Sequence, residues 1–145
     1  MAKQSDEITI TPEEYGEFIK GIELKDVYLS SSKIKRLREP DLDALLRYGP
    51  KRGKSKYGKS GDGFYGTFNF HVDLLEEGDE TPFGEINVTF VVSYVSEKRM
   101  TQKIFDIFQD YNLPLNAFPY VREYIHTTTH RMGMPALILP TMKNT

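Results

Sequence analysis

The chain contains no cysteine and no tryptophan among its 145 residues. The absence of cysteine excludes a disulfide framework, a thiolate nucleophile and a thiolate zinc site. Long apolar runs are also absent, since the longest uninterrupted aliphatic stretch, 136–139, has four residues, against about 18 in a membrane-spanning helix. These absences predict a cytoplasmic protein without a segment that inserts into a membrane.

Neither sign of charge dominates the sequence. Nineteen Lys and Arg residues oppose 21 Asp and Glu residues, which gives a formal net charge of -2. The whole molecule therefore has no strong attraction for nucleic acid or anionic lipid. With 39% hydrophobic and 12% aromatic residues, the composition is typical of a folded globular protein, and the length predicts a single domain over 1–145.

The clearest pattern is an alternation of apolar and polar residues over 64–74, which is repeated over 86–94 after an acidic turn. Alternation with a period of two is typical of half-buried strands, and a turn between two such strands favours an antiparallel hairpin. Earlier in the chain, the apolar residues over 21–29 change parity across Lys25-Asp26. This change indicates a further strand that carries a bulge.

Helices are predicted before and after these strands. Residues 11–14, Thr-Pro-Glu-Glu, have the form of a capping box and predict a short helix to about Lys20. After Lys98 the apolar period changes to about 3.6, which predicts a helix over 104–111. A break over 112–116 leads to a second C-terminal helix, expected to begin near Asn116 and to end at Gly133. This order predicts an α+β fold in which helices cover one face of an antiparallel sheet.

The segment 49–63 is rich in glycine and lysine and is expected to form an exposed, flexible loop after a short helix over 41–48. Residues 53–60 match the Gly-x4-Gly-Lys-Ser spacing of a phosphate-binding loop, but no buried strand precedes them and no helix follows them. The basic side chains of this region are Arg47, Lys51, Arg52, Lys54, Lys56 and Lys59. One hypothesis is a contact with RNA or DNA; a solvated loop is favoured because the net charge of the chain is negative.

The sequence does not favour a metal site, a cofactor or an enzyme. His126 and His130 are four residues apart on a predicted helix, but only His71 remains as a third imidazole and it lies on a predicted strand. No serine in a glycine elbow, no nucleophile with an assignable base and no carboxylate pair in apolar surroundings is recognisable. We therefore expect no catalytic residue and no cofactor.

Residues 116–123 read Asn-Ala-Phe-Pro-Tyr-Val-Arg-Glu, and residues 131–140 read Arg-Met-Gly-Met-Pro-Ala-Leu-Ile-Leu-Pro. Together with the upstream strands and the Lys25-Asp26-Val27 sequence, they resemble the SecB family of export chaperones, whose corresponding helix opens with Phe-Pro-Tyr-x-Arg-Glu. The resemblance extends over about 21–140. The positions that match the helix motif, which we expect to serve folding and assembly, are Phe118, Pro119, Tyr120, Arg122 and Glu123.

The resemblance implies an antiparallel four-stranded sheet with two C-terminal helices on one face, assembled as a homotetramer, a dimer of dimers. It also implies a chaperone that binds unfolded polypeptides without ATP. Such a holdase needs apolar grooves with adaptable methionine and aromatic side chains rather than catalytic groups. The candidate groove residues are Phe105, Phe108, Leu113, Leu115, Met132 and Met134. The alternative for each of them is a place in the core or in a subunit interface.

The chain also departs from the SecB pattern. In the family, an acidic surface of the sheet docks the translocase motor SecA; Asp26 matches one of its acids, whereas Ser30 stands in place of another. We therefore expect a divergent relative that holds apolar segments of unfolded proteins, either in export or for a dedicated client such as a labile antitoxin-type protein. The alternative function is that of a SecB-fold interaction domain that binds a specific protein or nucleic-acid partner through the basic segment 47–59.

Overall fold

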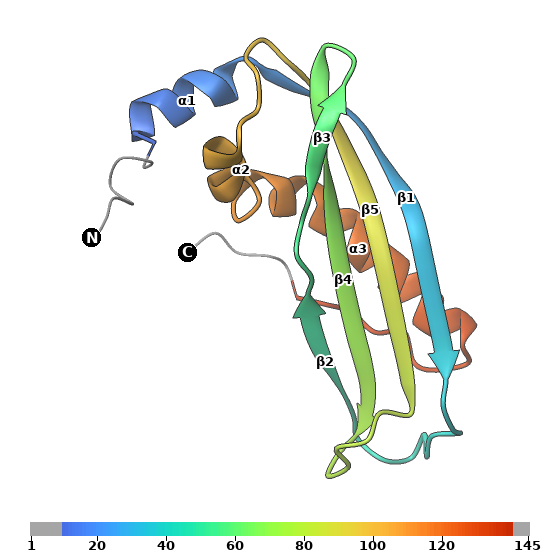
Figure 1. Cartoon of the computed structure of the whole chain (residues 1–145). Coiled ribbons are helices and arrows are strands. Elements are labelled where there is room, and N and C mark those ends of the chain that lie inside the picture. The colour runs from blue at the N-terminus through green and yellow to red at the C-terminus, as the bar shows by residue number, and fades with distance from the viewer. Residues whose placement is uncertain (1–9, 141–145) are drawn as a thin grey trace.

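The computed structural model describes residues 10–140 (Figure 1). Its described part is an α+β fold, which confirms the predicted fold class. The helices are α1 (Pro12–Lys20), α2 (Gln102–Phe108) and α3 (Asn112–Arg131). The strands are β1 (Ile22–Arg36), β2 (Leu46–Arg52), β3 (Tyr57–Ser60), β4 (Gly63–Glu76) and β5 (Gly84–Ser96).

The sheet has five strands rather than the four expected. The strand order is β1-β5-β4-β2, β3 also pairs with β4, and every pairing is antiparallel. Strand β2 pairs with residues 70–76 of β4, whereas β3 pairs with residues 63–66. The additional strand therefore arises because two short strands share one edge of β4.

The prediction of a loop over 49–63 is wrong, because most of this segment lies in β2 and β3. The predicted helix over 41–48 is also wrong, since β2 begins at Leu46. Both errors have one physical cause. The edge of β4 offers backbone donors and acceptors that a segment can satisfy without any apolar pattern of its own, and edge strands tolerate lysine and proline.

The two long strands that were predicted as a hairpin are confirmed as β4 and β5, which pair from Gly63 opposite Val95 to Leu74 opposite Gly84. The strand predicted over 21–29 is also present but continues to Arg36. Its register shifts between Leu24 and Asp26, which confirms the expected bulge, and shifts again between Leu29 and Ser31.

The start of α1 agrees with the local sequence signal, whereas the start of α3 does not. The capping box of α1 is confirmed: Glu14 N donates to Thr11 Oγ1 at 3.0 Å, and Thr11 N donates to Glu14 Oε1 at 2.9 Å. Helix α3 begins at Asn112, so the expected break and the cap at Asn116 are wrong. Proline at position 114 lies in the first turn, where an N–H has no partner within the helix, so it does not interrupt α3. Among residues 10–140, no helix combines the length and apolar character needed to cross a membrane.

The three helices pack on the same face of the sheet, here called the inner face. The ring of Phe64 on β4 lies 5.8 Å from that of Phe18 on α1 and 5.3 Å from that of Phe108 on α2. Further along β4, Phe70 contacts Phe118 of α3 at a ring distance of 5.6 Å. The buried residues of β4 alternate along the strand as the sequence pattern predicts. These contacts confirm that the C-terminal helices cover one face of the sheet.

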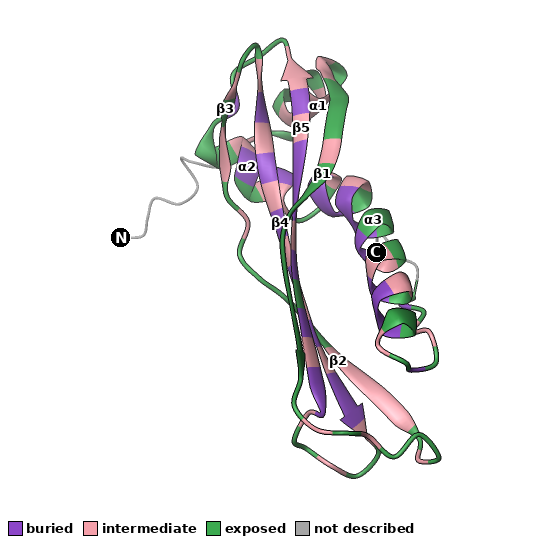
Figure 2. Cartoon of the chain, turned by 90° about the vertical axis from the view of Figure 1, so that its right-hand side faces the viewer, coloured by how far each residue is buried: buried purple, intermediate pink, exposed green. Residues whose placement is uncertain are grey.

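Burial is uneven across the sheet (Figure 2). The central strands β4 and β5 are buried at alternate positions, whereas β1 is exposed over almost its whole length. Strand β2 lies at the end of the sheet away from α1 and α2 (Figure 1). Two regions are therefore less well covered by the three helices: the β1 edge and the end of the sheet that carries β2.

Candidate functional site

An apolar groove lies beside β2. Residues 37–45, which join β1 to β2 and are here termed the crossover segment, contribute to its rim. Residues 134–139, which follow α3 and are here termed the tail segment, also line it, and the buried side chains of Leu74 and Phe83 form its floor. The groove has a volume of about 300 Å³, and its apolar lining includes Leu42, Leu45, Leu46, Tyr48, Leu74, Phe83, Met134 and Leu137. Such a lining fits apolar side chains of a ligand.

Two leucines of the crossover segment line this groove and are exposed to solvent. Leu42 is 50% exposed and Leu45 is 75% exposed. Complete burial of a leucine side chain contributes about 1.5–3 kcal/mol, so the folded chain leaves apolar surface here that a ligand could cover. Clustered exposed apolar residues on a soluble protein typically mark an interaction surface.

Helix α3 holds the tail segment in place. Arg122 Nε donates to the carbonyl oxygen of Leu139 at 2.9 Å. Leu137 N donates to Thr129 Oγ1 at 2.9 Å, and the same hydroxyl donates to the carbonyl oxygen of Ile125 at 2.8 Å. Because Thr129 is fully buried, water does not compete for these hydrogen bonds. The tail side of the groove is therefore anchored at two points of α3.

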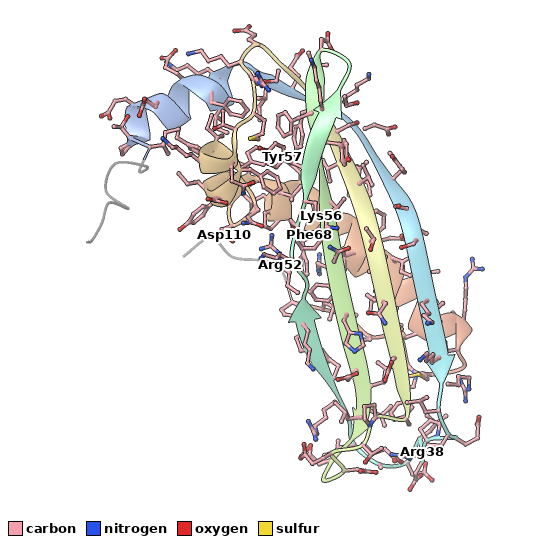
Figure 3. All side chains as sticks on the ribbon, viewed as in Figure 1. Arg38, Arg52, Lys56, Tyr57, Phe68 and Asp110 are labelled. Atoms are coloured by element: carbon pink, nitrogen blue, oxygen red, sulfur yellow. The ribbon has the colours of Figure 1, made fainter. Side chains whose placement is uncertain are left out.

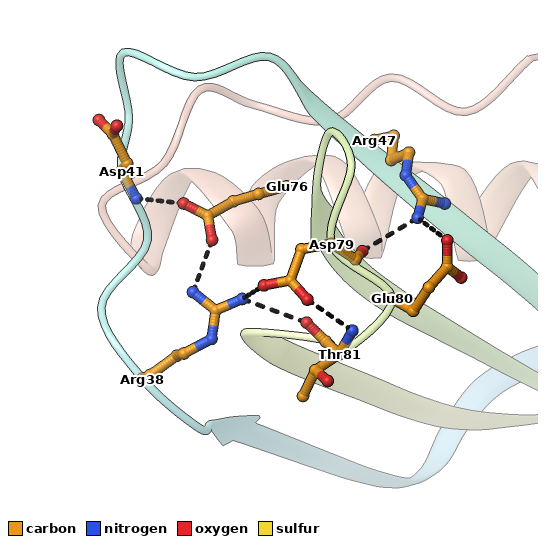
Figure 4. Close-up of polar contacts among 7 residues, drawn as sticks. All are labelled: Arg38, Asp41, Arg47, Glu76, Asp79, Glu80 and Thr81. Atoms are coloured by element: carbon orange, nitrogen blue, oxygen red, sulfur yellow. Dashed lines mark hydrogen bonds and ion pairs between the residues drawn. The ribbon is translucent and has the colours of Figure 1, made fainter.

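The crossover segment is anchored by a carboxylate at the end of β4 (Figure 4). Glu76 Oε1 accepts a hydrogen bond from Arg38 Nη1 at 2.5 Å, and Glu76 Oε2 accepts one from Asp41 N at 2.7 Å. Arg38 Nη2 also donates to Asp79 Oδ2 at 2.7 Å. The hydrogen bond from the Asp41 amide and the contact with Arg38 favour the ionised form and lower the pKa of Glu76. The carboxylate is therefore charged near neutral pH.

The six side chains predicted to form a client groove do not lie together at the surface. Phe105, Phe108 and Leu113 are at most 1% exposed and belong to the core, so a ligand does not reach them in this structure. Leu115 is exposed on α3, and Met132 packs against the core. Met134 alone lines the apolar groove described above. Three of the six candidates therefore take the alternative place in the core, because the apolar faces of α2 and α3 that carry them pack on the sheet.

The sequence patterns missed the leucines of the crossover segment. Leu42, Leu45 and Leu46 have the i, i+3, i+4 spacing of a helix face, which predicts a helix over 41–48 rather than leucines exposed at a groove. The concentration of leucines in a short and otherwise polar segment is the signal in the sequence that points to an interaction surface.

The residues of the SecB-like helix motif support the fold and the tail. Phe118 is buried against Phe70, and Arg122 binds the tail segment. Tyr120 is 45% exposed and packs on Phe90 at a ring distance of 6.2 Å. Pro119 is on the exposed side of α3, and Glu123 accepts a hydrogen bond from Thr127 Oγ1 at 2.9 Å.

The basic residues of 47–59 divide into two groups. Arg47 Nη2 donates to the carbonyl oxygen of Asp79 at 3.0 Å, and the Arg52 guanidinium lies 4.8 Å from the centroid of the Phe68 ring (Figure 3). The four lysines of the set are all exposed and make no ion pair within residues 10–140: Lys51, Lys54, Lys56 and Lys59. Gly58-Lys59-Ser60 lies in β3 rather than at a helix N-terminus, so the segment does not have the geometry of a phosphate-binding loop.

The remaining sequence candidates lie apart from the groove. Asp26 is exposed on β1 next to the first register shift, and a contact with SecA stays a prediction. His126 and His130 are both exposed on α3. Over residues 10–140, no three ligating side chains are close enough to hold a metal ion.

Comparison with solved structures identifies a protein of similar fold. The SecB-like chaperone Rv1957 of Mycobacterium tuberculosis, in complex with a ChAD peptide from the Rv1956 HigA1 antitoxin, superposes with a TM-score of 0.79 at 15% sequence identity. The superposition covers 90% of this chain and 98% of that chain. No protein-family model and no curated protein sequence matches the chain. The fold is therefore SecB-like, as the motifs in the sequence suggested, with strong divergence in sequence.

Proposed function

We propose that the protein is an ATP-independent chaperone-like protein that binds extended apolar segments of non-native polypeptides. The observation that carries this proposal is the open apolar groove between the crossover and tail segments, with Leu42 and Leu45 exposed at its rim. A groove that is lined by apolar side chains and bordered by a segment without regular structure accepts varied sequences, as a holdase requires. The peptide bound to the SecB-like protein Rv1957 supports a polypeptide as the class of ligand.

The floor and rim of the groove suggest how a segment would bind. Buried residues of β4 and of the turn before β5 close the floor, so a ligand adds contacts without unfolding the core. Apolar side chains of the client would cover Leu42 and Leu45 and transfer both leucines out of water. A folded protein has buried most of its large apolar side chains, so extended apolar segments are available mainly in unfolded or newly synthesised chains.

The direct test is an aggregation assay with a chemically unfolded client. Dilution of the client from denaturant into a molar excess of this protein should slow the rise in light scattering, and gel filtration should isolate a complex. ATP should not change either result. Failure to slow aggregation, together with the absence of an isolable complex, would refute the proposed function.

A second candidate function is binding of a specific protein or nucleic acid through the basic segment 47–59. It is favoured by the lysines of this segment, which form no ion pair within residues 10–140. Simultaneous replacement of Lys51, Lys54, Lys56 and Lys59 by glutamine tests it, because Arg47 and Arg52 stay in place to support the fold. Client holding should survive this replacement, whereas binding through the segment should be lost and should depend on salt.

We further propose that the chain assembles into a homotetramer, a dimer of dimers. Strand β1 is an edge strand with one partner, β5, in the described part of the chain. Its inner face carries Leu24, Leu29 and Ile34, which are 50%, 42% and 45% exposed. A long edge with exposed apolar side chains is prone to pair with another chain, so a second copy that covers β1 would bury this surface.

A further inference from the structure

We propose that Glu76 is a positioning residue of the groove: its carboxylate holds the crossover segment in the arrangement that receives a polypeptide. This inference rests on the proposed function, which supplies the ligand. The inference rests on the two hydrogen bonds that the Glu76 carboxylate accepts. One oxygen binds Arg38 and the other binds Asp41, and both residues belong to the crossover segment (Figure 4).

The crossover segment is attached to the β4–β5 hairpin at its ends by backbone hydrogen bonds. Leu37 N donates to the carbonyl oxygen of Phe83 at 2.8 Å, and Glu77 N donates to the carbonyl oxygen of Leu45 at 2.8 Å. Between these points, Arg38 N donates to the carbonyl oxygen of Phe83 at 3.4 Å, and the other described hydrogen bonds from the segment to the hairpin come from the Arg38 guanidinium and from Asp41 N. The middle of the segment therefore depends on side-chain contacts, and Glu76 accepts from both residues.

Glu76 is suited to this role by its position. It is the last residue of β4 and pairs with Leu46, the first residue of β2. Its side chain is 14% exposed, whereas the Arg38 side chain is 36% exposed. Hydrogen bonds to an ionised carboxylate that is shielded from water are stronger than those between neutral groups, so the carboxylate is a firm anchor on a rigid element.

The anchored segment carries Leu42, which follows Asp41 directly, and an internal turn supports this part of the segment. Asp43 N donates to Asp41 Oδ1 at 3.0 Å, and Ala44 N donates to the carbonyl oxygen of Asp41 at 3.0 Å. Fixing Asp41 therefore fixes the turn that presents Leu42 to the groove. Because the crossover segment is already ordered in the free protein, binding of a polypeptide does not have to include the entropic cost of ordering it.

The test compares Glu76→Gln with Glu80→Gln. Glutamine at position 76 keeps the size of the side chain but removes the negative charge that both donors bind. Glu80 lies on the same turn, its carboxylate is 93% exposed and its ion pair is with Arg47 at 3.4 Å, so Glu80→Gln removes an equal charge without touching the crossover segment. The probe is a short fluorescent peptide rich in leucine and phenylalanine, with lysines at its ends for solubility.

We expect Glu76→Gln to weaken binding of this peptide by about tenfold, the effect of losing a charge-assisted hydrogen bond, and Glu80→Gln to leave it unchanged. Amide hydrogen exchange in Glu76→Gln should become faster mainly over residues 39–44, whereas exchange of the β4 and β5 amides should change only as far as a modest fall in the midpoint of urea unfolding requires. Saturating peptide should restore protection of these amides in the variant, because binding and ordering are linked. A role in global stability alone would instead make exchange in β4 and β5 faster to the same extent as exchange over 39–44.

The outcomes separate the inference from the proposed function. A wild-type protein that does not bind the peptide refutes the proposed function and with it a role of Glu76 in capture. Normal binding by the wild type and by Glu76→Gln, or unchanged exchange over 39–44, refutes the positioning role alone.

Discussion

The guanidinium of Arg52, at the end of β2, lies over the ring of the fully buried Phe68, with 4.8 Å between Cζ and the ring centroid. Phe68 is at the point of β4 where the edge partner changes, since β2 pairs with residues 70–76 and β3 with residues 63–66. Arg52 also donates a hydrogen bond to the carbonyl oxygen of Gln109, after α2. It therefore covers the core where the edge of the sheet is interrupted (Figure 3).

Replacement of Arg52 by alanine should lower the free energy of unfolding by about 1–2 kcal/mol, because a cation–π contact and a hydrogen bond to a backbone carbonyl are lost. Urea unfolding followed by far-UV circular dichroism measures the effect. Lys51→Ala is the matched control, since Lys51 is the neighbouring residue of β2 and is exposed. Equal loss of stability in both variants would contradict a specific role for Arg52.

Replacement of Leu45 by aspartate should weaken binding of an unfolded client by about tenfold or more with little change in stability. The side chain is 75% exposed in the folded chain, so the substitution removes apolar contact that is made only with a ligand. Client binding is measured by fluorescence anisotropy, and unfolding by urea titration.

Leu115→Asp is the control for this experiment, because Leu115 is a 45% exposed leucine on α3 outside the groove. It was also one of the groove residues expected from the sequence. If Leu115→Asp weakens binding as much as Leu45→Asp, client contact is not confined to the groove beside β2.

The stability of the protein should depend on the charge of His71, which lies on the face of the sheet opposite the helices. Burial disfavours the charged ring, but the contacts of its nitrogens with Asp73 Oδ1 at 2.7 Å and Asn87 Oδ1 at 2.8 Å prevail, and the pKa of His71 is raised. Since the pKa is higher in the folded than in the unfolded state, the stabilisation is complete below the ordinary value of about 6.5 and is lost as pH rises through the raised pKa.

The free energy of unfolding of the wild type should therefore exceed that of His71→Gln by a margin that shrinks as the pH rises above about 6.5. Urea titrations at a series of pH values measure this margin. His126→Gln serves as the control, because His126 is exposed on α3. A margin that does not change with pH would show that the charge of His71 contributes nothing.

Static light scattering should give a mass near four times the 16.7 kDa of one chain. Leu29→Lys should reduce this mass, because Leu29 is 42% exposed on the inner face of β1 and a charge there opposes burial by a second copy. Ser31→Lys, at an exposed position of the same strand, should leave the mass unchanged. A wild-type protein that is a strict monomer at all concentrations would refute the proposed assembly.

Local patterns predicted much of the fold because the contacts that they describe lie close together in the chain. The alternation over 64–74 and 86–94 and the capping box at residue 11 depend on residues within a few positions of one another. The motif around Phe118 and Arg122 likewise pointed to a SecB-like fold. By contrast, an aromatic helix face has the same sequence whether it packs on the sheet or receives a ligand, so only the structure places Phe105 and Phe108 in the core.

The sequence by itself determined the α+β class and the central hairpin, since these follow from residue type and from short-range periodicity. Only the tertiary structure decided that 46–60 contributes two edge strands and that the groove lies between the crossover and tail segments. The reason is that both depend on partners far away in the chain. The edge of β4 pairs with a segment that has no strand pattern, and Glu76 accepts a hydrogen bond from Asp41, 35 positions earlier in the sequence. Neither contact can therefore be predicted from a local stretch of residues.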